Sequence, residues 1–208
     1  MYYKRSEDEI ITPMAGSAAA THVCGEAPLY ARILGSDWQR LHPAIRRAHS
    51  TGHGLCARGR FRIVHGRSRI AGIICHLMPL PRESNEVDTV LEVSTSTAGE
   101  MWRRRFGNDV VCTTQRFSAA GQVWERLGRL ELLLTVRLQG DGLTYRSIAA
   151  RFRIGILRIP LPSFLAPKVE AHESPVSVSG TQAQVSVMFP GRRLLISYTG
   201  RLELGDQL

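Results

Sequence analysis

Apolar and polar residues alternate along most of the chain between Val87 and Leu204, and turn residues interrupt the alternation at short intervals. Successive side chains of a β-strand point to opposite faces, so this period of two predicts half-buried strands. About eight short strands with turns between them are typical of a barrel or sandwich, not of a parallel sheet. We therefore predict a mainly β (α+β) fold, an antiparallel meander that forms a calyx-like barrel or a strongly curved sheet. The predicted strands are Val87–Thr97, Met101–Phe106, Val110–Ser118, Val123–Leu127 with Arg129–Gln139, Leu143–Ile154, Lys168–Glu173, Gln182–Phe189 and Arg193–Leu204.

Two glycines in this region support more specific predictions. Gly128 separates two apolar runs, and we predict one strand that bends there at a bulge. Asp141 and Gly142 form the strongest hairpin signal of the chain. The strand after Gly142 is therefore expected to return antiparallel to the strand before it.

The segment Gly155–Pro167 interrupts the meander. It contains three prolines, which cannot donate a hydrogen bond to a central strand ladder. Its apolar residues are too numerous for a solvated loop, so we expect the segment to pack across a barrel mouth or a sheet edge. These apolar residues are Ile156, Leu157, Ile159, Leu161, Phe164 and Leu165.

The chain before Val87 predicts an arm followed by short helices. Residues 1–26 are polar or small and lack helical periodicity, so we expect a flexible N-terminal arm (with Met14 as an alternative start) and a single β-rich domain over 27–208. Residues 28–49 have the apolar spacing of short helices that act as a lid or brace. The apolar stretch Ile70–Met78 predicts one further short helix on the open side of the barrel; peripheral membrane contact is its less favoured alternative role.

The composition indicates a globular chain with an arginine-rich surface. The 208 residues are 43% hydrophobic and 22% charged, which suits a folded domain and excludes a disordered or fibrous chain. The formal net charge is +9, and all basic residues except Lys4 and Lys168 are arginines. A basic surface attracts anions. Nucleic-acid binders usually combine lysine and arginine in clusters, so the composition disfavours nucleic acid as a partner.

The cysteines and histidines do not follow a metal-binding or redox pattern. None of the 4 cysteines has C-x-x-C spacing, and the 7 histidines form no ligand-spaced set. We expect reduced, buried thiols, a cytoplasmic location and no metal. The sequence also lacks the Gly-rich loop that binds a dinucleotide after a strand, so we expect no cofactor.

Catalytic motifs are also missing from the sequence. The G-x-S-x-G pattern of a nucleophile elbow does not occur. Glu170 and Glu173 are the nearest approach to paired acid/base carboxylates, but their odd spacing places them on opposite faces of a strand. The sequence therefore favours a protein without enzymatic activity.

One strand places an arginine between two aromatic residues on the same face. Trp102, Arg104 and Phe106 alternate with two other arginines. If this face points inward, the guanidinium of Arg104 requires a carboxylate or an anionic ligand. Glu125 and Glu173 are the candidate carboxylates. Three interpretations remain open: an anion-binding pocket, an Arg–Glu pair that fixes strand register, or a solvated face.

Three stretches of the sequence resemble a known family. They are Leu29–Gly35 with the residues up to His49, Trp102–Gly107 with Glu125–Gly128, and Ile159–Glu173 with Tyr198–Gly200. Together they are similar to the bacterial domain-of-unknown-function 4166 family, over nearly all of Pro28 to Leu204. The resemblance implies no established activity and no catalytic residue. It does imply a domain that occurs alone or behind a dehydrogenase-like or epimerase-like domain. One departure is Arg201, where the family has a bulky aromatic residue, so a pocket lined by this position would take a different ligand.

The sequence thus predicts a non-catalytic binding module for a small apolar or amphipathic anionic ligand. The alternative is an accessory or docking domain for a separate dehydrogenase-like or epimerase-like oxidoreductase. An enzyme with an unrecognised site and a nucleic-acid-binding protein are weaker alternatives. The candidate ligand-binding residues are Trp102, Arg104, Phe106, Glu125, Tyr145, Phe152, Glu173 and Tyr198.

Overall fold

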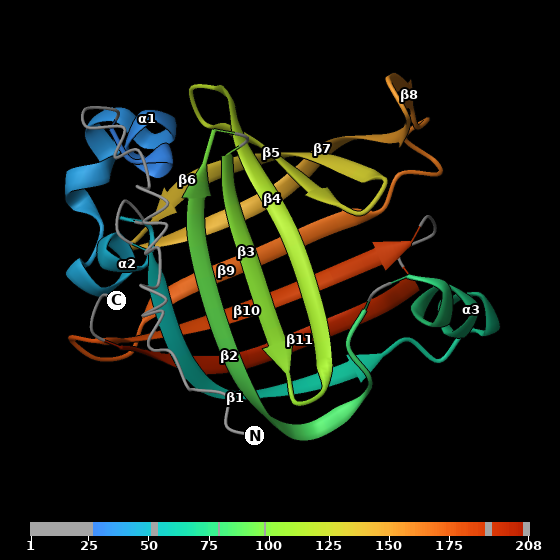
Figure 1. Cartoon of the computed structure of the whole chain (residues 1–208), viewed down its shortest axis with the longest axis horizontal. Coiled ribbons are helices and arrows are strands. Elements are labelled where there is room, and N and C mark those ends of the chain that lie inside the picture. Colours follow the sequence, from blue (N-terminus) through green and yellow to red (C-terminus); the bar gives the residue numbers. More distant parts are fainter. Residues whose placement is uncertain (1–26, 51–53, 79, 98, 190–192, 206–208) are drawn as a thin grey trace, which may run out of the picture.

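The computed structural model describes residues 27–50, 54–78, 80–97, 99–189 and 193–205. The predicted N-terminal arm lies outside this part of the chain. The described residues build a β-barrel with short helices at its two ends (Figure 1).

Eleven strands form one antiparallel sheet in the order β6-β5-β4-β3-β2-β1-β11-β10-β9-β7-β8, and the pairing of β6 with β7 closes 10 of them into a barrel. The predicted mainly β, calyx-like architecture is therefore confirmed. The strands are β1 (Leu55–His65), β2 (Ser84–Ser96), β3 (Gly99–Phe106), β4 (Asp109–Ala119), β5 (Gln122–Leu127), β6 (Leu130–Gln139), β7 (Gly142–Ile154), β8 (Leu157–Pro160), β9 (Lys168–Pro175), β10 (Gly180–Phe189) and β11 (Arg193–Leu204).

Alternation along the strands separates the inside of the barrel from its outside. On β3, Trp102 and Phe106 are 4% and 3% exposed, whereas the arginines Arg103 and Arg105 are exposed. The same period of two recurs on the neighbouring strands, so their apolar residues meet inside the barrel and form its core.

Three short helices cover one end of the barrel (Figure 1): α1 (Leu29–Leu34), the 3-10 helix η1 (Gly35–Arg40) and α2 (Pro43–Ala48). Residues 28–49 are called the helical cap below. Backbone hydrogen bonds join this cap to the strand turns beneath it: Gly121 donates to the Ile33 carbonyl and His42 donates to the Asp141 carbonyl. The short N-terminal helices that the sequence predicts thus close one end of the barrel.

The helix α3 (Arg69–Leu77) lies at the opposite end, between β1 and β2 in the chain (Figure 1). Ser68 caps it by accepting a hydrogen bond from the Ala71 amide at 3.1 Å. Ala71 is 1% exposed, and the Cys75 thiol donates to the Leu195 carbonyl of β11, so one side of α3 rests on the barrel. We call this end the mouth; the turns at 107–108, 128–129 and 155–156 also lie there.

The predicted bent strand at Gly128 is wrong. β5 and β6 are two antiparallel strands in which Leu127 lies opposite Leu130, and Gly128 and Arg129 form the turn between them. Gly128 has a φ of +57°, the left-handed conformation that a tight two-residue hairpin turn requires. Gly128 therefore lies in the turn between β5 and β6 and does not bend a single strand.

The predicted hairpin at Asp141 and Gly142 is confirmed with a small shift. Gln139 of β6 lies opposite Gly142 of β7, so the central residues of the turn are Gly140 and Asp141. Gly140 has a φ of +63°, which makes it the residue that allows the turn.

The prediction that Gly155–Pro167 packs across the mouth or a sheet edge is only partly right. Its first half forms β8, which does lie at the edge of the sheet, where it pairs with the last residues of β7. Its apolar side chains remain exposed, however, with Ile156 at 93% and Phe164 at 68%. The β7–β8 hairpin extends beyond the closed wall, since β7 pairs with β9 only over Leu143–Arg146.

Candidate binding site inside the barrel

Arg104 lies inside the barrel, on the same face of β3 as Trp102 and Phe106. Its neighbours across the sheet are Leu91 of β2 and Val111 of β4, both buried. The Nη1 atom of Arg104 donates a hydrogen bond of 3.0 Å to the Thr113 hydroxyl. Of the three interpretations of this strand, the solvated face is therefore excluded.

The carboxylate partner of Arg104 is Glu125 of β5. Arg104 Nη1 and Glu125 Oε1 are 3.9 Å apart, so the two charges attract each other without a close bidentate hydrogen bond. Burial by itself lowers the pKa of Arg104, but Tyr198, Glu125 and Glu173 raise it above its usual value. The guanidinium is therefore a permanent positive charge inside the barrel.

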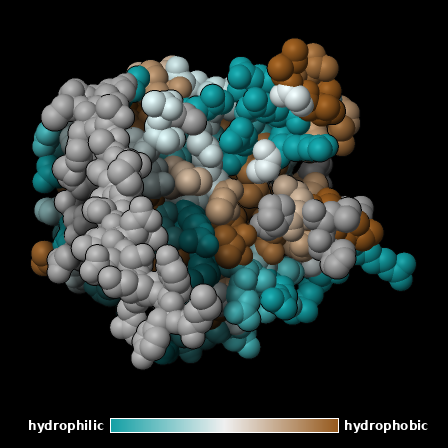
Figure 2. Space-filling view, viewed as in Figure 1, coloured by the Kyte–Doolittle hydropathy of each residue, from teal (hydrophilic) through white to brown (hydrophobic). Residues whose placement is uncertain are grey.

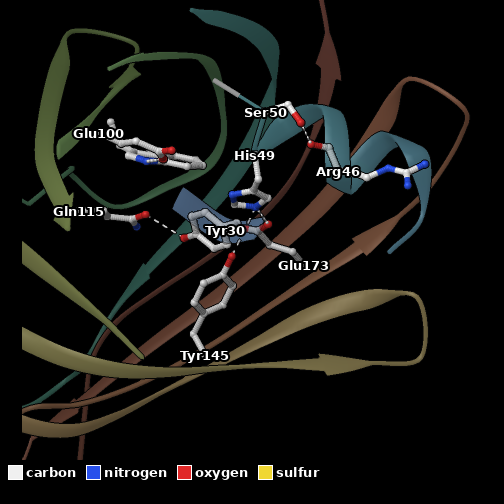
Figure 3. Close-up of polar contacts among 9 residues, drawn as sticks. Tyr30, Arg46, His49, Ser50, Glu100, Gln115, Tyr145 and Glu173 are labelled. Carbon is white, nitrogen blue, oxygen red and sulfur yellow. Dashed lines mark hydrogen bonds and ion pairs between the residues drawn. The ribbon is translucent and has the colours of Figure 1, made fainter. Parts of the chain in front are cut away.

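A second polar group sits where the helical cap meets the barrel. His49 follows α2 and is 0% exposed. Its Nε2 atom lies 2.7 Å from Oε2 of Glu173 on β9, and 3.4 Å from the Tyr145 hydroxyl of β7 (Figure 3). A carboxylate is an acceptor only, so Nε2–H of His49 donates to Glu173. Nδ1 of His49 is buried and has no hydrogen-bond partner among the described residues.

Aromatic rings surround His49. The ring of Tyr30 lies 3.9 Å from the His49 ring, and the ring of Trp102 lies 5.3 Å from it, measured between centroids. The Tyr30 hydroxyl donates to Oε1 of Gln115 at 2.8 Å (Figure 3). Trp102 donates through Nε1 to Oε2 of Glu100 at 3.2 Å. The cap is thus held to strands on both sides of the barrel by buried polar contacts.

The ionisation states in this cluster follow from burial and from the charges nearby. Burial by itself raises the pKa of Glu173, but His49, with smaller contributions from Arg104 and Tyr145, holds it below its usual value. Burial, together with the charge of Glu173, raises the pKa of Tyr30 and Tyr145 well above the usual value of a phenol. At neutral pH Glu173 is therefore a carboxylate and both phenols are neutral.

Charged side chains inside the barrel keep part of their surface accessible. The side chains of Arg104, Glu125 and Glu173 are 20%, 18% and 23% exposed, although the strands close around them. A water molecule can therefore contact part of each of these three side chains. Tyr198, on β11, is also only half-buried.

The structure brings most of the predicted site residues together. Arg104 and Glu125 form an ion pair, Glu173 and Tyr145 meet at His49, and Phe106 lies 5.7 Å from Tyr198 between ring centroids. Phe152 is the exception among the predicted residues. It lies where β7 pairs with β8 instead of β9, and it is 38% exposed at the mouth.

Sequence reasoning missed several members of the cluster. The candidate residues do not include His49, Tyr30, Glu100 or Gln115. The sequence offers one indication of such residues, a polar residue on a strand face that is otherwise apolar. Glu100, two residues before Trp102 on β3, is an example. No local pattern connects His49 to a partner 124 residues away.

Two other sequence predictions concern the outer face. Glu170 and Glu173 do face opposite sides of β9: Glu170 Oε1 lies 3.3 Å from Nη2 of the exposed Arg146, whereas Glu173 points inward. Arg201 is exposed on the outside of β11, next to the buried Leu202. The departure at Arg201 from the family pattern therefore does not alter the barrel interior.

A groove of about 550 Å³ lies on the outside of the barrel, over β6, β7, β9 and β10. Outward-facing polar residues form much of its lining, among them Arg137, Arg146 and His172. Of the predicted site residues only Tyr145 borders it. This groove is therefore distinct from the polar interior around Arg104.

The described part of the chain holds no group of three or more His, Cys, Asp or Glu side chains that could bind a metal ion. None of the helices in the described ranges has the length and apolar sequence of a transmembrane span.

Comparison with known proteins gives a family but no activity. The family model described as "Domain of unknown function (DUF4166)" matches residues 41–202. A search of curated proteins finds no match. Among solved structures, the barrel is similar to a protein of unknown function from the DUF3598 family of Nostoc punctiforme PCC 73102, with 11% sequence identity and a TM-score of 0.38. That match covers 72% of this chain and 46% of the other.

Proposed function

The chain belongs to the DUF4166 family, and because the family's description assigns no activity, we propose from the geometry that the protein is a non-catalytic binding module. It takes a small amphipathic molecule into the barrel, with an anionic group of the ligand at Arg104 and an apolar part against the aromatic residues nearby. The single observation that carries this proposal is the inward, accessible guanidinium of Arg104.

The hydrogen-bonding capacity of Arg104 supports an anionic ligand. A guanidinium has five N–H donors. Within the described ranges, Arg104 uses Nη1 for Thr113 and stands 3.9 Å from Glu125. An Arg–Glu pair that served only to fix strand register would be expected to close to a direct, hydrogen-bonded contact. The long separation leaves donors for a carboxylate or a similar group.

The walls near Arg104 suit the apolar part of such a ligand. The rings of Phe61, Phe106 and Tyr198 contact one another with centroids 5.7 to 6.2 Å apart. Trp102 lies on the other side, with its ring 5.3 Å from the Arg104 guanidinium carbon. Ligand sites in proteins combine such apolar walls with a few polar groups that orient the ligand.

The test is a fluorescence titration with an acid-bearing amphipathic probe, 11-(dansylamino)undecanoic acid, on the full chain. Replacing Arg104 by Gln removes a charge-assisted contact, so the expected loss of affinity is about tenfold to a hundredfold. Arg105→Gln is the matched control, since it removes the same charge from the next residue, which points outward. It should bind the probe like the wild type.

Two results would reject the proposal: no probe binding by the wild-type protein, or equal loss of affinity in both variants. Thermal unfolding of Arg104→Gln, followed by circular dichroism, checks that the variant is folded. If Arg104→Gln unfolds, Arg104→Met or Arg104→Lys takes its place, and Arg104→Lys should keep part of the affinity because it keeps the charge.

A further inference from the structure

The β7–β8 hairpin and the loop after it expose a cluster of large apolar side chains at the mouth. Figure 2 shows this cluster as the brown projection at the upper right, over β8. Its members are Ile154, Ile156, Leu157, Ile159, Phe164 and Leu165, which are between 47% and 93% exposed. We call these six residues the mouth patch. Single exposed apolar residues are common, but a contiguous cluster on a projecting element marks an interaction site.

The segment of the chain that carries the mouth patch has charges of one sign. Between residues 151 and 168 the chain has three arginines and one lysine, and no acidic residue. Arg158 and Lys168 are exposed. The neighbouring β5–β6 turn adds Arg126 and Arg129, which line a shallow pocket together with Arg153. The apolar projection is therefore bordered by basic side chains.

The carboxylate of Glu131 lies beside some of these arginines but is itself buried. Glu131 of β6 has a side chain only 1% exposed. It is bound by the Nε atom of Arg151, and Arg116 lies 3.7 Å away. Arg151, Arg116 and Arg153 surround this single carboxylate, so the positive charges here outnumber the negative one. The side chains of Arg129, Arg158 and Lys168 are exposed to solvent.

The edge of β8 is poorly suited to pairing with a strand from a partner protein. β8 pairs with β7 on one side only, and it ends at Pro160. A second proline, Pro162, follows. Proline has no amide hydrogen to donate, so it blocks the addition of a strand at a sheet edge. The surface thus offers apolar side chains and positive charge, and its one open strand edge is short and ends at a proline.

We propose that the mouth patch docks the protein on the surface of an anionic phospholipid bilayer. The apolar tips of the hairpin and of the following loop enter the boundary between headgroups and acyl chains, while Arg129, Arg158 and Lys168 contact anionic headgroups. Apolar burial and attraction to anionic lipid together drive this mode of peripheral binding. The membrane role considered for α3 thus falls mainly to the β7–β8 hairpin and the loop after it, which expose six large apolar residues, whereas the large apolar residue that α3 exposes is Ile73.

The experiment is flotation of the full chain with two kinds of vesicle, phosphatidylcholine alone and phosphatidylcholine mixed with phosphatidylserine. The wild type should float with the mixed vesicles, and added salt should reduce this binding. Ile156→Asn and Phe164→Asn should each weaken it about tenfold, because each removes a large apolar side chain from the bilayer. Arg158→Gln should weaken it about fivefold on anionic vesicles.

Two control variants match these changes at the opposite end of the barrel. Val178→Asn alters an apolar residue that is 84% exposed, in the turn between β9 and β10. Arg201→Gln removes one exposed charge from the last strand. Both should float like the wild type. All these positions except Arg201 lie in exposed hairpin or loop segments, and circular dichroism confirms that the variants fold.

Three outcomes would overturn the proposal. The wild type does not float with anionic vesicles; Val178→Asn weakens flotation as much as Ile156→Asn; or the protein self-associates through the patch and ignores vesicles. In the last case sedimentation of Ile156→Asn would give a monomer, and the patch would be an interface between copies. Docking on the bilayer does not depend on a ligand inside the barrel. Arg104→Gln should therefore float with the mixed vesicles like the wild type, whether or not it binds the fluorescent probe.

Discussion

Nε2 of His49 lies 2.7 Å from Oε2 of Glu173, and this contact joins the helical cap to the wall of the barrel. The two residues are 124 positions apart, one after a helix and the other on β9. Since His49 is fully buried, the cap cannot move away from β9 without leaving a polar ring and a carboxylate unpaired.

Breaking this pair should destabilise the protein strongly. We expect His49→Ala to lower the free energy of unfolding by about 3 kcal/mol, because it leaves a cavity and an unpaired buried carboxylate. Glu173→Gln should lower it by about 1–2 kcal/mol, since the amide oxygen can still accept from Nε2. Urea unfolding followed by circular dichroism measures both. Glu170→Gln, on the outer face of the same strand, is the control and should change the free energy by less than about 1 kcal/mol.

The same pair predicts a loss of stability in acid. The pKa of Glu173 in the folded protein lies below the usual 4.5, so the unfolded chain takes up this proton first as the pH falls. The stabilisation from Glu173 is complete above the unfolded pKa and disappears as the pH falls through the lowered folded value. The free energy of unfolding, measured from neutral pH to about pH 3, should therefore fall less steeply in Glu173→Gln than in the wild type. Other carboxylates affect both proteins alike, so the difference between the two pH curves reports on Glu173. If the free energy of unfolding falls equally steeply in both proteins, the prediction is wrong.

Glu125 is expected to oppose an anionic ligand at Arg104. Its carboxylate stands 3.9 Å from the guanidinium, where it both competes for Arg104 and repels a second anion. Glu125→Gln should therefore bind the dansylated fatty acid about three- to tenfold more tightly than the wild type. Weaker binding would instead indicate that Glu125 accepts a hydrogen bond from the ligand. Glu92→Gln, at an exposed surface pair, is the control and should leave the affinity unchanged.

The buried Glu131 on the outer face should contribute more to stability than a surface pair. Its carboxylate contacts Arg151, whose guanidinium carbon lies 3.6 Å from the centroid of the Trp124 ring. Glu131→Ala leaves these positive charges without their counter-ion and should lower the free energy of unfolding by about 3 kcal/mol. Glu92→Ala breaks the exposed pair with Arg103 and should cost less than about 1 kcal/mol. Equal effects in urea unfolding would contradict this.

The alternation on β3 shows how far sequence reasoning carries. It places Trp102, Arg104 and Phe106 on one face, and this is confirmed, because a strand's side chains alternate whatever surrounds it. It does not say which face is inside. That depends on the closure of the barrel between β6 and β7, which a local pattern does not contain.

Gly128 and the mouth patch show where local reasoning fails. A glycine between two apolar runs fits either a bulge or a tight turn, and only the pairing of Leu127 with Leu130 decides between them. The apolar composition of Gly155–Pro167 indicates burial, but burial needs an element to cover it. The hairpin extends beyond the wall, so its apolar side chains stay exposed.

The sequence by itself determined most of the strands and turns, the short N-terminal helices and the face shared by Arg104 with two aromatic rings. These follow from contacts between near neighbours and from the period of the backbone. The tertiary structure alone decided that Arg104 points inward, that His49 meets Glu173, and that the β7–β8 hairpin stays uncovered. Each of these depends on segments far apart in the chain, and their meeting is set by barrel closure instead of by any local preference.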